Sequence, residues 1–274
     1  MPDLSLLFIL LLVFAAAIYF IWPYYRLRKA LAEPFPTEWR RILVRNVPVY
    51  RHMPTDLQLQ LKQRIKQFIH EKHFTGCAGL ELTDEMRVTI AACACLLILN
   101  RKTSVYPGLR YILVYPEAFL VQRDALDETG LAAVRKHSLL GESWDNGKVI
   151  LSWEDVIRGS RDAGDGSNVA LHEFAHQLDH ESGATNGAPV LGSAAGYKRW
   201  ARVLTAEFED LQRAAYQGDE TLLDYYGATE PAEFFAVVTE VFFERPKELA
   251  QRHPALFEQL RGYFRVNPAE WRIQ

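Results

Sequence analysis

The stretch that most constrains this chain reads Leu-His-Glu-Phe-Ala-His-Gln-Leu-Asp over residues 171–179. If it is helical, His172 and His176 lie one turn apart on a single face, so two imidazoles can converge on one ion. This is the zinc-binding His-Glu-x-x-His pattern. Glu173 follows the first histidine, where a carboxylate can act as general base on a water at the ion rather than as a ligand. The motif therefore predicts two zinc ligands and a base.

The residues around the motif favour a helix. Ser167 or Asn168 can cap its start, and Gly183 lies just beyond its end. Apolar residues recur at helical spacing, in a stripe made of Leu171, Phe174, Ala175 and Leu178. A pair of helix histidines without such a context is more often structural or solvated. Because the cap, the stripe and the motif agree, the metal interpretation is favoured here.

Composition excludes several classes of protein. The chain has 274 residues, of which 49% are hydrophobic and 24% charged, with a net charge of −3. These values are ordinary for a globular protein, and there is no basic excess of the kind that nucleic-acid binding requires. Its three cysteines, Cys77, Cys93 and Cys95, make no disulfide framework and no zinc ribbon. A reducing compartment fits them best.

An uncharged apolar run fills residues 4–22. At 1.5 Å per residue, a helix over this run is long enough to cross a hydrocarbon core of about 30 Å. Aromatic and then basic residues lie at its carboxyl end: Tyr19, Trp22, Tyr24, Tyr25, Arg26, Arg28 and Lys29. The sequence therefore predicts an N-terminal transmembrane anchor at residues 1–25, with the rest of the chain in the cytoplasm.

A cleaved signal peptide is the alternative for this run, because residues 15–17 are three alanines that could form a cleavage site. The amino-terminal flank argues against it, since it carries Asp3 and no Lys or Arg. The apolar run also continues past the alanines to Trp22. An uncleaved anchor is therefore favoured.

The rest of the chain divides into a linker and one domain. Residues 26–48 are predicted to form a juxtamembrane linker, because Pro34 and Pro36 argue against one continuous helix. Residues 49–274 should form an α+β domain that is mainly helical with a small sheet. Helices are expected at 55–73, 83–96, 198–217 and from Thr229 or Glu230 through 243, and strands at 111–115, 118–122 and 149–153.

A catalytic zinc needs a third protein ligand. Glu233 and Glu240 fall two turns apart on one face of an otherwise apolar helix that opens at Pro231. Carboxylates on such a face need a reason, because unpaired buried charge is costly, and a zinc site supplies one. His180 lies on the motif helix and His253 follows a charged stretch, so neither suits. Glu233 is the preferred third ligand and Glu240 the alternative.

Longer motifs accompany the histidine pattern at residues 83–92, 141–144, 151–153, 231–237 and 242–246. Together with residues 172–179 they resemble the Mlc titration factor A family of zinc metallopeptidases, from about Pro34 to the carboxyl end. The string Tyr-Gly-x-Thr-x-x-Ala-Glu-Phe-Phe at residues 226–235 is also similar to the catalytic domain of anthrax-toxin lethal factor, whose glutamate in that position binds zinc.

The resemblance implies a zincin-like fold of the gluzincin type. One zinc ion per chain would be held by His172, His176 and Glu233, with Glu173 as base and Tyr226 as donor to the developing oxyanion. It implies peptidase activity, mainly of the aminopeptidase type, and an interaction with a glucose-responsive transcriptional repressor. Familiar members look soluble, whereas this chain begins with the predicted anchor. We therefore expect a single-pass protein of the bacterial inner membrane with a cytoplasmic catalytic domain.

Several roles stay open at this point. Tyr225 could replace Tyr226 as the donor, and either could simply pack its ring. Asp179 could orient His176 as an acceptor, or it could cap the end region of the helix by contacting water or His180. Trp144 and Trp153 suit the core or the wall of a substrate cleft, and residues 149–153 could pair with an extended substrate.

Two rival functions remain beside the peptidase. A membrane-tethered protein of this kind could bind and sequester a regulator, with catalysis incidental. A scaffold with a purely structural zinc would instead need a fourth protein ligand.

Overall fold

The computed structural model describes residues 4–101, 103–117, 147–162 and 164–271. Within these residues the sheet has three parallel strands in the order β1 (His73–Gly76), β2 (Tyr111–Tyr115) and β3 (Lys148–Ser152). Tyr111 pairs with both His73 and Lys148, so the three strands start level. The predicted strands at 111–115 and 149–153 are confirmed, except that Trp153 opens a helix. The predicted strand at 118–122 lies outside the described residues.

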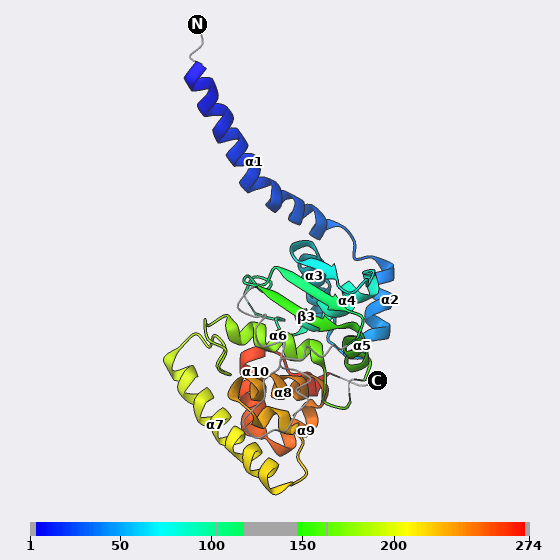
Figure 1. The fold of residues 1–274 in the computed structure, drawn as a ribbon, viewed down its shortest axis with the longest axis vertical. Helices are drawn as coiled ribbons and strands as arrows, with labels where there is room; N and C mark the ends of the chain where they lie inside the picture. The colour runs from blue at the N-terminus through cyan, green and yellow to red at the C-terminus, as the bar shows by residue number, and fades with distance from the viewer. Residues whose placement is uncertain (1–3, 102, 118–146, 163, 272–274) are drawn as a thin grey trace.

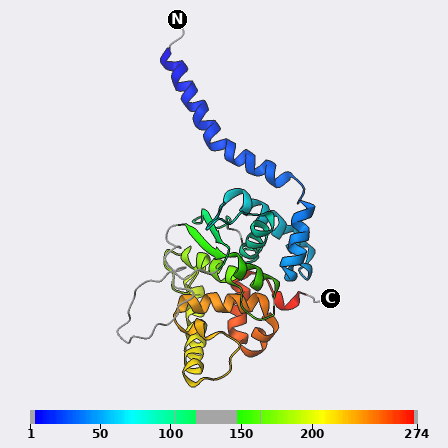
Figure 2. The ribbon, with the colours of Figure 1, turned by 45° about the vertical axis from the view of Figure 1, so that its right-hand side comes forward.

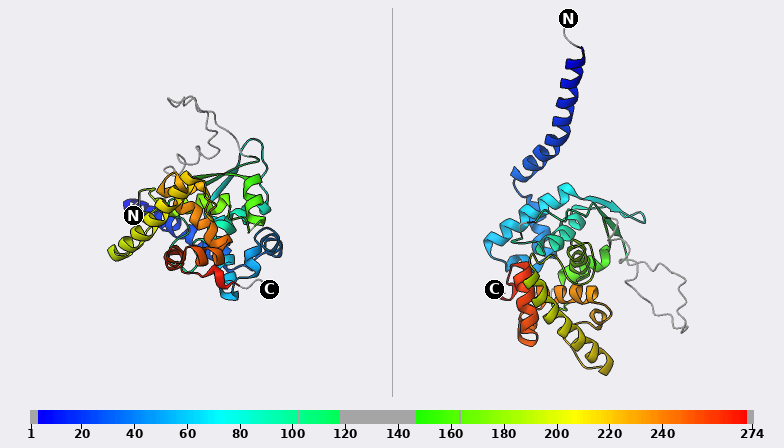
Figure 3. Two further views of the ribbon diagram at one scale, coloured as in Figure 1. Left: turned by 90° about the horizontal axis from the view of Figure 1, so that it is seen from below. Right: turned by 90° about the vertical axis from the view of Figure 1, so that its left-hand side faces the viewer.

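The helices divide into two groups (Figure 1). Near the sheet lie α2 (Thr37–Asn46), α3 (Thr55–Glu71), α4 (Asp84–Leu96) and α5 (Trp153–Arg161). Farther along the chain come α7 (Ala194–Gln217), α8 (Pro231–Glu244), α9 (Pro246–Arg252) and α10 (Pro254–Phe264). Short 3-10 helices occupy Pro48–Arg51, Tyr225–Ala228 (η3) and Pro268–Glu270. The motif helix α6 (Val169–His180) lies between the groups, as the right-hand view of Figure 3 shows.

Helix α4 explains how the motif helix is held. Thr83 caps it by accepting a hydrogen bond from the backbone of Met86 at 3.3 Å, and every residue from Val88 to Leu96 is buried. This matches the expectation for a nearly all-apolar helix. Helix α4 packs against α2, α3, α5 and α6. The motif helix therefore packs against a helix that is buried from Val88 to Leu96.

The predicted linker at residues 26–48 differs from what the structure shows. The chain does break at Pro34 and Pro36, as expected for residues that lack a backbone N–H. After the break, however, it forms α2, which buries Ile42 and Leu43 in the core. The side-chain amide of Asn46 in α2 also donates to Glu85 and Thr89. The folded domain therefore begins ahead of residue 49.

Helix α1 (Leu4–Ala32) projects away from the rest of the chain (Figures 1 and 2). Its carboxyl end touches α3, where the ammonium of Lys66 donates to the carbonyl of Leu31 at 2.8 Å. Within the described residues no helix combines the length and the apolar character that crossing a membrane demands.

Candidate metal centre

The motif helix α6 begins where the sequence predicts. Asn168 is its N-cap, and the side-chain oxygen of Asn168 accepts from the backbone N–H of Leu171 at 3.1 Å. Every residue from Ala170 to Asp179 is buried. His172 and His176 therefore lie on one face of a fixed helix, with exposed fractions of 6% and 1%.

Helix α8 supplies the carboxylates. It begins at Pro231, where a missing N–H costs no hydrogen bond, and it packs against α6. Glu233 and Glu240 are buried on it, each with an exposed fraction of 6%. Aromatic residues fix the remaining faces of α8 in the core, among them Phe234, Phe235, Phe242 and Phe243. The two glutamates are therefore aimed at α6 by packing.

Three side-chain atoms from the two helices converge. Nε2 of His172 lies 2.9 Å from Oε2 of Glu233 and 3.1 Å from Nε2 of His176. Nε2 of His176 lies 3.4 Å from the same glutamate oxygen. Ligands bound tetrahedrally at 2.0–2.1 Å from zinc stand about 3.3 Å from one another. The donor set and its spacing therefore fit a zinc ion.

Glu240 lies on the other side of the His172 ring. Its Oε1 atom is 2.8 Å from Nδ1 of His172, and its Oε2 atom accepts from the backbone N–H of Asn168. A carboxylate at Nδ1 holds a proton there and leaves Nε2 with its lone pair directed at the ion. The structure thus places Glu233, and not Glu240, beside the Nε2 atoms of both histidines.

The pKa shifts in this cluster indicate that the buried carboxylates stabilise a positive charge among them. Burial acts to lower the pKa of His172, but the carboxylates of Glu240 and Glu233 outweigh it and raise that pKa well above its ordinary value. Burial acts to raise the pKa of Glu233, yet hydrogen bonds to His172 and His176 bring it below its ordinary value. A divalent cation would satisfy the same demand.

Glu173 and Tyr226 lie close to the cluster. Glu173 is buried on α6, and its charge acts on both His172 and Tyr226. Tyr226 is half-buried in η3, and its ring centre is 6.0 Å from that of His172. Burial and the neighbouring Glu233 raise the pKa of the Tyr226 phenol, so it stays protonated and can donate.

Tyr225, the alternative donor, points elsewhere. Its ring is exposed, with an exposed fraction of 41%, and its hydroxyl donates to the backbone carbonyl of Asp219. Asp224 caps η3 by accepting from the backbone of Tyr226 at 2.7 Å. The short helix therefore turns Tyr226, and not Tyr225, towards the histidines.

Comparison with known proteins supports the interpretation of this cluster as a metal centre. Residues 22–265 match the family described as glucose-regulated metallo-peptidase M90. The chain belongs to this family. It is 39% identical to an uncharacterized protein of Synechocystis sp. over 95% of this chain and 97% of the relative. It is 34% identical to a Mlc titration factor A of Klebsiella pneumoniae over 91% of this chain and 92% of that protein. Another relative of that name, from Escherichia fergusonii, is 34% identical over 81% and 84%.

Membership of family M90 supports a metallopeptidase-type enzyme that uses a metal ion and acts on peptides. The resemblance to the Mlc titration factor A family is confirmed by the relatives that carry this name. Within the described residues of this M90 chain, His172, His176 and Glu233 form a group that can hold a metal.

Asp179 takes a role that the sequence does not predict. Its Oδ2 atom accepts from the backbone N–H of Gly187 at 2.6 Å, so it fixes the loop after α6 rather than His176. The carbonyl of Gly187 in turn accepts from the indole N–H of Trp200 at 2.8 Å. A Cβ at Gly187 would lie 2.3 Å from the carbonyl oxygen of Pro231, at the start of α8. Burial raises the pKa of Asp179 to about 6.

The sequence motifs contain two tryptophans, Trp144 and Trp153, which suit the core or the wall of a substrate cleft. Trp153 opens α5 and packs against the core while half-buried. Trp144 and the rest of the motif at residues 141–144 lie outside the described residues. Asn168 is one of the two caps that the sequence predicts, whereas the role of Gly187 does not follow from the prediction, although the Asn-Gly pair at 186–187 indicates a turn.

Proposed function

We propose that this chain is a zinc-dependent peptidase of the gluzincin type. The observation that carries the proposal is the convergence of Nε2 of His172, Nε2 of His176 and Oε2 of Glu233, with mutual distances of 2.9, 3.1 and 3.4 Å. These three residues would hold one zinc ion per chain. When bound, zinc supplies Lewis acidity, which brings the pKa of a water towards neutrality and polarises a carbonyl group.

The remaining chemistry falls to two side chains. The buried carboxylate of Glu173 would take the proton of the attacking water and pass it to the leaving amine. The Tyr226 phenol, kept protonated by burial, would donate a hydrogen bond to the carbonyl oxygen as negative charge develops on it. Glu173 interacts electrostatically with His172 and Tyr226, and Tyr226 interacts with Glu233, which supports these roles.

Strand β3 supports a peptide as the substrate. It packs against α6 and, within the described residues, pairs only with β2. An open strand edge beside the metal ligands can take an extended peptide by main-chain hydrogen bonds. Cleavage of the aminopeptidase type is the form of this activity that the family resemblance favours.

Glu173→Gln tests the mechanism. The variant keeps the shape of the side chain and removes the base, so zinc should stay bound while peptide hydrolysis is lost. In the same assay Tyr226→Phe should lower kcat by roughly ten- to a thousandfold with little effect on KM, because its donor acts on the transition state. Hydrolysis by Glu173→Gln at the rate of the unaltered enzyme would reject this mechanism.

A regulator that sequesters a transcriptional repressor is the second candidate function. The name Mlc titration factor A, carried by relatives of 34% identity, favours it. The variant Glu173→Gln distinguishes binding from catalysis. It should relieve repression fully if sequestration is the function, and it should fail to do so if cleavage is needed. Repression of a reporter gene in cells that express each form is the measurement.

Attachment to the bacterial inner membrane is also a proposal. Its support is the set of exposed apolar side chains on α1, which includes Phe8, Leu11, Leu12, Val13, Phe14, Phe20, Ile21 and Trp22. Exposed apolar residues in such number indicate a surface that is covered by a partner or by lipid. The basic residues after Trp22 favour a cytoplasmic catalytic domain.

A further inference from the structure

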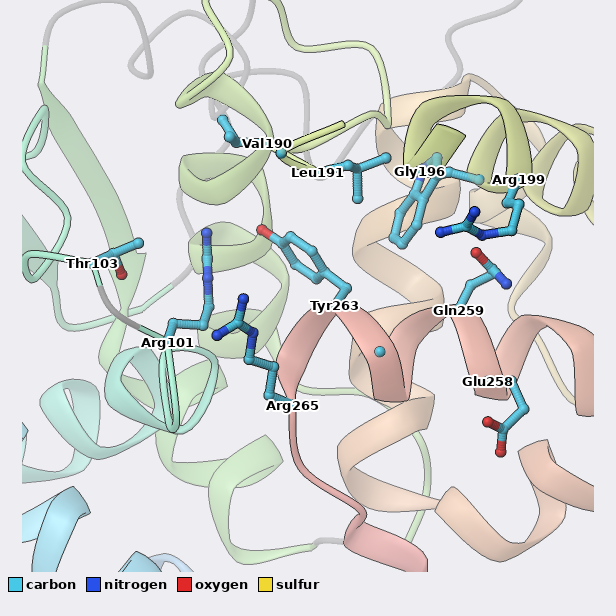
Figure 4. Close-up of a pocket in the computed structure, with 13 residues that line it drawn as sticks. Arg101, Thr103, Val190, Leu191, Gly196, Arg199, Glu258, Gln259, Tyr263 and Arg265 are labelled. Atoms are coloured by element: carbon cyan, nitrogen blue, oxygen red, sulfur yellow. The ribbon is translucent and has the colours of Figure 1, made fainter. Parts of the chain in front are cut away.

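A pocket separate from the metal centre lies where the segment after α4, the loop after α6, helix α7 and helix α10 meet (Figure 4). Its volume is about 470 Å³, within the range of pockets that bind small organic molecules. None of the candidate metal ligands, nor Glu173 or Tyr226, lines it. Its polar lining includes Arg101, Thr103, Arg199, Gln259, Tyr263 and Arg265.

Three buried polar groups of this lining lack hydrogen-bond partners within the described residues. They are Nη1 of Arg101, Oγ1 of Thr103 and the hydroxyl of Tyr263. Arg101 and Tyr263 are each only 8% exposed. A buried polar group without a partner is costly, and such groups are rare in folded proteins. Their presence together in one pocket indicates that a ligand completes their hydrogen bonds.

The polar groups at the base are held in place. The guanidinium of Arg64 donates to the carbonyls of Arg101 and Thr103 at 2.9 and 3.0 Å. The guanidinium of Arg101 lies 4.8 Å from the ring centre of Tyr263. Figure 4 shows the Tyr263 hydroxyl and the Arg101 guanidinium on the same side of the pocket. A preformed arrangement of donors reduces the entropy lost when a ligand binds.

The charge of the lining selects an anion. Arg199 and Arg265 are exposed at the pocket and form no ion pair within the described residues. Glu258 is the acidic residue of the lining, and it already accepts from Arg261 at 2.6 and 3.0 Å. Burial raises the pKa of Tyr263, so its phenol remains a neutral donor. Arginine guanidinium groups bind phosphate and carboxylate groups in a planar, two-point geometry.

We propose that this pocket binds a small organic molecule through a phosphate or carboxylate group, with Arg101, Thr103 and Tyr263 at its base and Arg199 and Arg265 at its mouth. The volume exceeds what an inorganic anion needs, and Val190, Leu191 and Trp200 provide an apolar side for the rest of the molecule. The ligand is thus an anionic metabolite rather than a free ion.

The ligand would bind next to the end of the motif helix. Nη2 of Arg101 is 3.3 Å from the carboxylate of Glu181, which is the C-cap of α6. A bound anion would compete with Glu181 for this guanidinium. Occupation of the pocket is therefore able to alter how firmly α6, with its two histidines, is held.

Titration of the full-length protein with inorganic phosphate, and in a second arm with succinate, tests this proposal at constant ionic strength in chloride. One of the two anions should bind saturably, and which one does so distinguishes a phosphate ligand from a carboxylate ligand. Tyr263→Phe keeps the aromatic ring, which packs against Arg101 and Trp200, so the variant should fold. Arg265→Asn is also compatible with folding, because the left-handed backbone at this residue, with a φ of 57°, suits asparagine.

Each of these variants should weaken binding by at least about tenfold, since each removes a donor to the anion. Arg202→Gln, an exposed arginine of α7 outside the pocket, is the matched control and should bind as the unaltered protein does. Phosphate bound to zinc would be insensitive to all three substitutions. The proposal is overturned if neither anion binds saturably, or if Tyr263→Phe and Arg265→Asn bind as tightly as the control.

Discussion

The two buried glutamates of α8 contact opposite nitrogens of the same imidazole. Glu233 lies at Nε2 of His172, on the side of the second histidine, and Glu240 lies at Nδ1. Glu240 also accepts from the backbone of Asn168, the residue that caps α6. One carboxylate therefore fixes both the tautomer of a metal ligand and the start of the helix that carries it.

Glu240→Gln should weaken zinc binding by about 10- to 100-fold, the usual cost of losing a carboxylate that orients a ligating histidine. The amide offers one acceptor where the structure uses two, so either His172 or Asn168 loses its partner. Competition with a zinc chelator measures the affinity. Glu230→Gln, at the exposed N-cap of the same helix, is the control, and equal affinity of the two variants would contradict this role.

The sequence predicts some residues of the site better than others, for a physical reason. His172, Glu173 and His176 are related by the period of one helix, so local spacing is enough to place them. Glu233 and Glu240 share a face two turns apart, and only the packing of α8 on α6 shows which one lies beside both Nε2 atoms. The role of Asp179 depends on the fold of the loop at Gly187, which no periodicity encodes.

At the scale of elements, the start of α6 is joined to the end of α8 through Asn168. Its amide donates to Oε1 of Glu244 at 3.1 Å, while Oε2 of Glu244 has no partner within the described residues. Burial raises the pKa of Glu244 to about 9. The folded protein therefore holds a proton on this carboxyl that the unfolded chain releases near its ordinary pKa of 4.5.

The stability of the protein should consequently depend on pH. The contribution of Glu244 is fully present below pH 4.5 and is lost as the pH rises towards about 9, because only the folded state binds the proton in this window. Glu244→Gln removes the titration and should raise the free energy of unfolding at pH 8 by at least about 1 kcal/mol. Near pH 4.5 it should have little effect.

Urea unfolding at pH 5 and pH 8 measures this difference. Glu220→Gln, on the exposed turn after α7, is the control and should change neither value. A gain of stability in Glu244→Gln that is equal at both pH values would contradict a raised pKa at this position.

Some helices and strands can be predicted from their own sequence, whereas others depend on what they pack against or pair with. The buried α4 follows from its composition, and α6, α7 and α8 follow from caps and apolar stripes. The sequence predicts a linker where α2 lies, because two prolines precede it. In the structure, however, α2 has a buried face made of Ile42, Leu43 and Asn46. Strand β1 is only His73–Gly76, too short to show alternation, and it exists through pairing with β2.

At the scale of the whole molecule, the position of α6 between two groups of helices accounts for the site. The sheet and α4 hold one side of α6, and α8 brings Glu233 to it from the other. The pocket lined by Arg101 and Tyr263 is joined to the carboxyl end of the same helix by the ion pair between Arg101 and Glu181. Helix α1 stands apart from this arrangement and touches it through α3.

If α1 attaches the protein to a membrane, removal of residues 1–25 should release it. The full-length protein should sediment with the membrane fraction, and the truncated form should remain in solution, because the exposed apolar side chains of α1 are gone. Alkaline phosphatase fused after Gln274 should be inactive if the catalytic domain is cytoplasmic. Equal distribution of both forms between the fractions, or an active fusion, would contradict the proposal.

Helices α6 and α8 together are proposed to bind a metal ion through His172, His176 and Glu233. The zinc content of the purified protein should be measured beside that of Glu233→Ala, with Glu230→Ala, at the exposed N-cap of α8, as control. We expect one zinc per chain in the unaltered protein and in the control, and loss of zinc in Glu233→Ala. Full retention of zinc by Glu233→Ala would contradict this expectation.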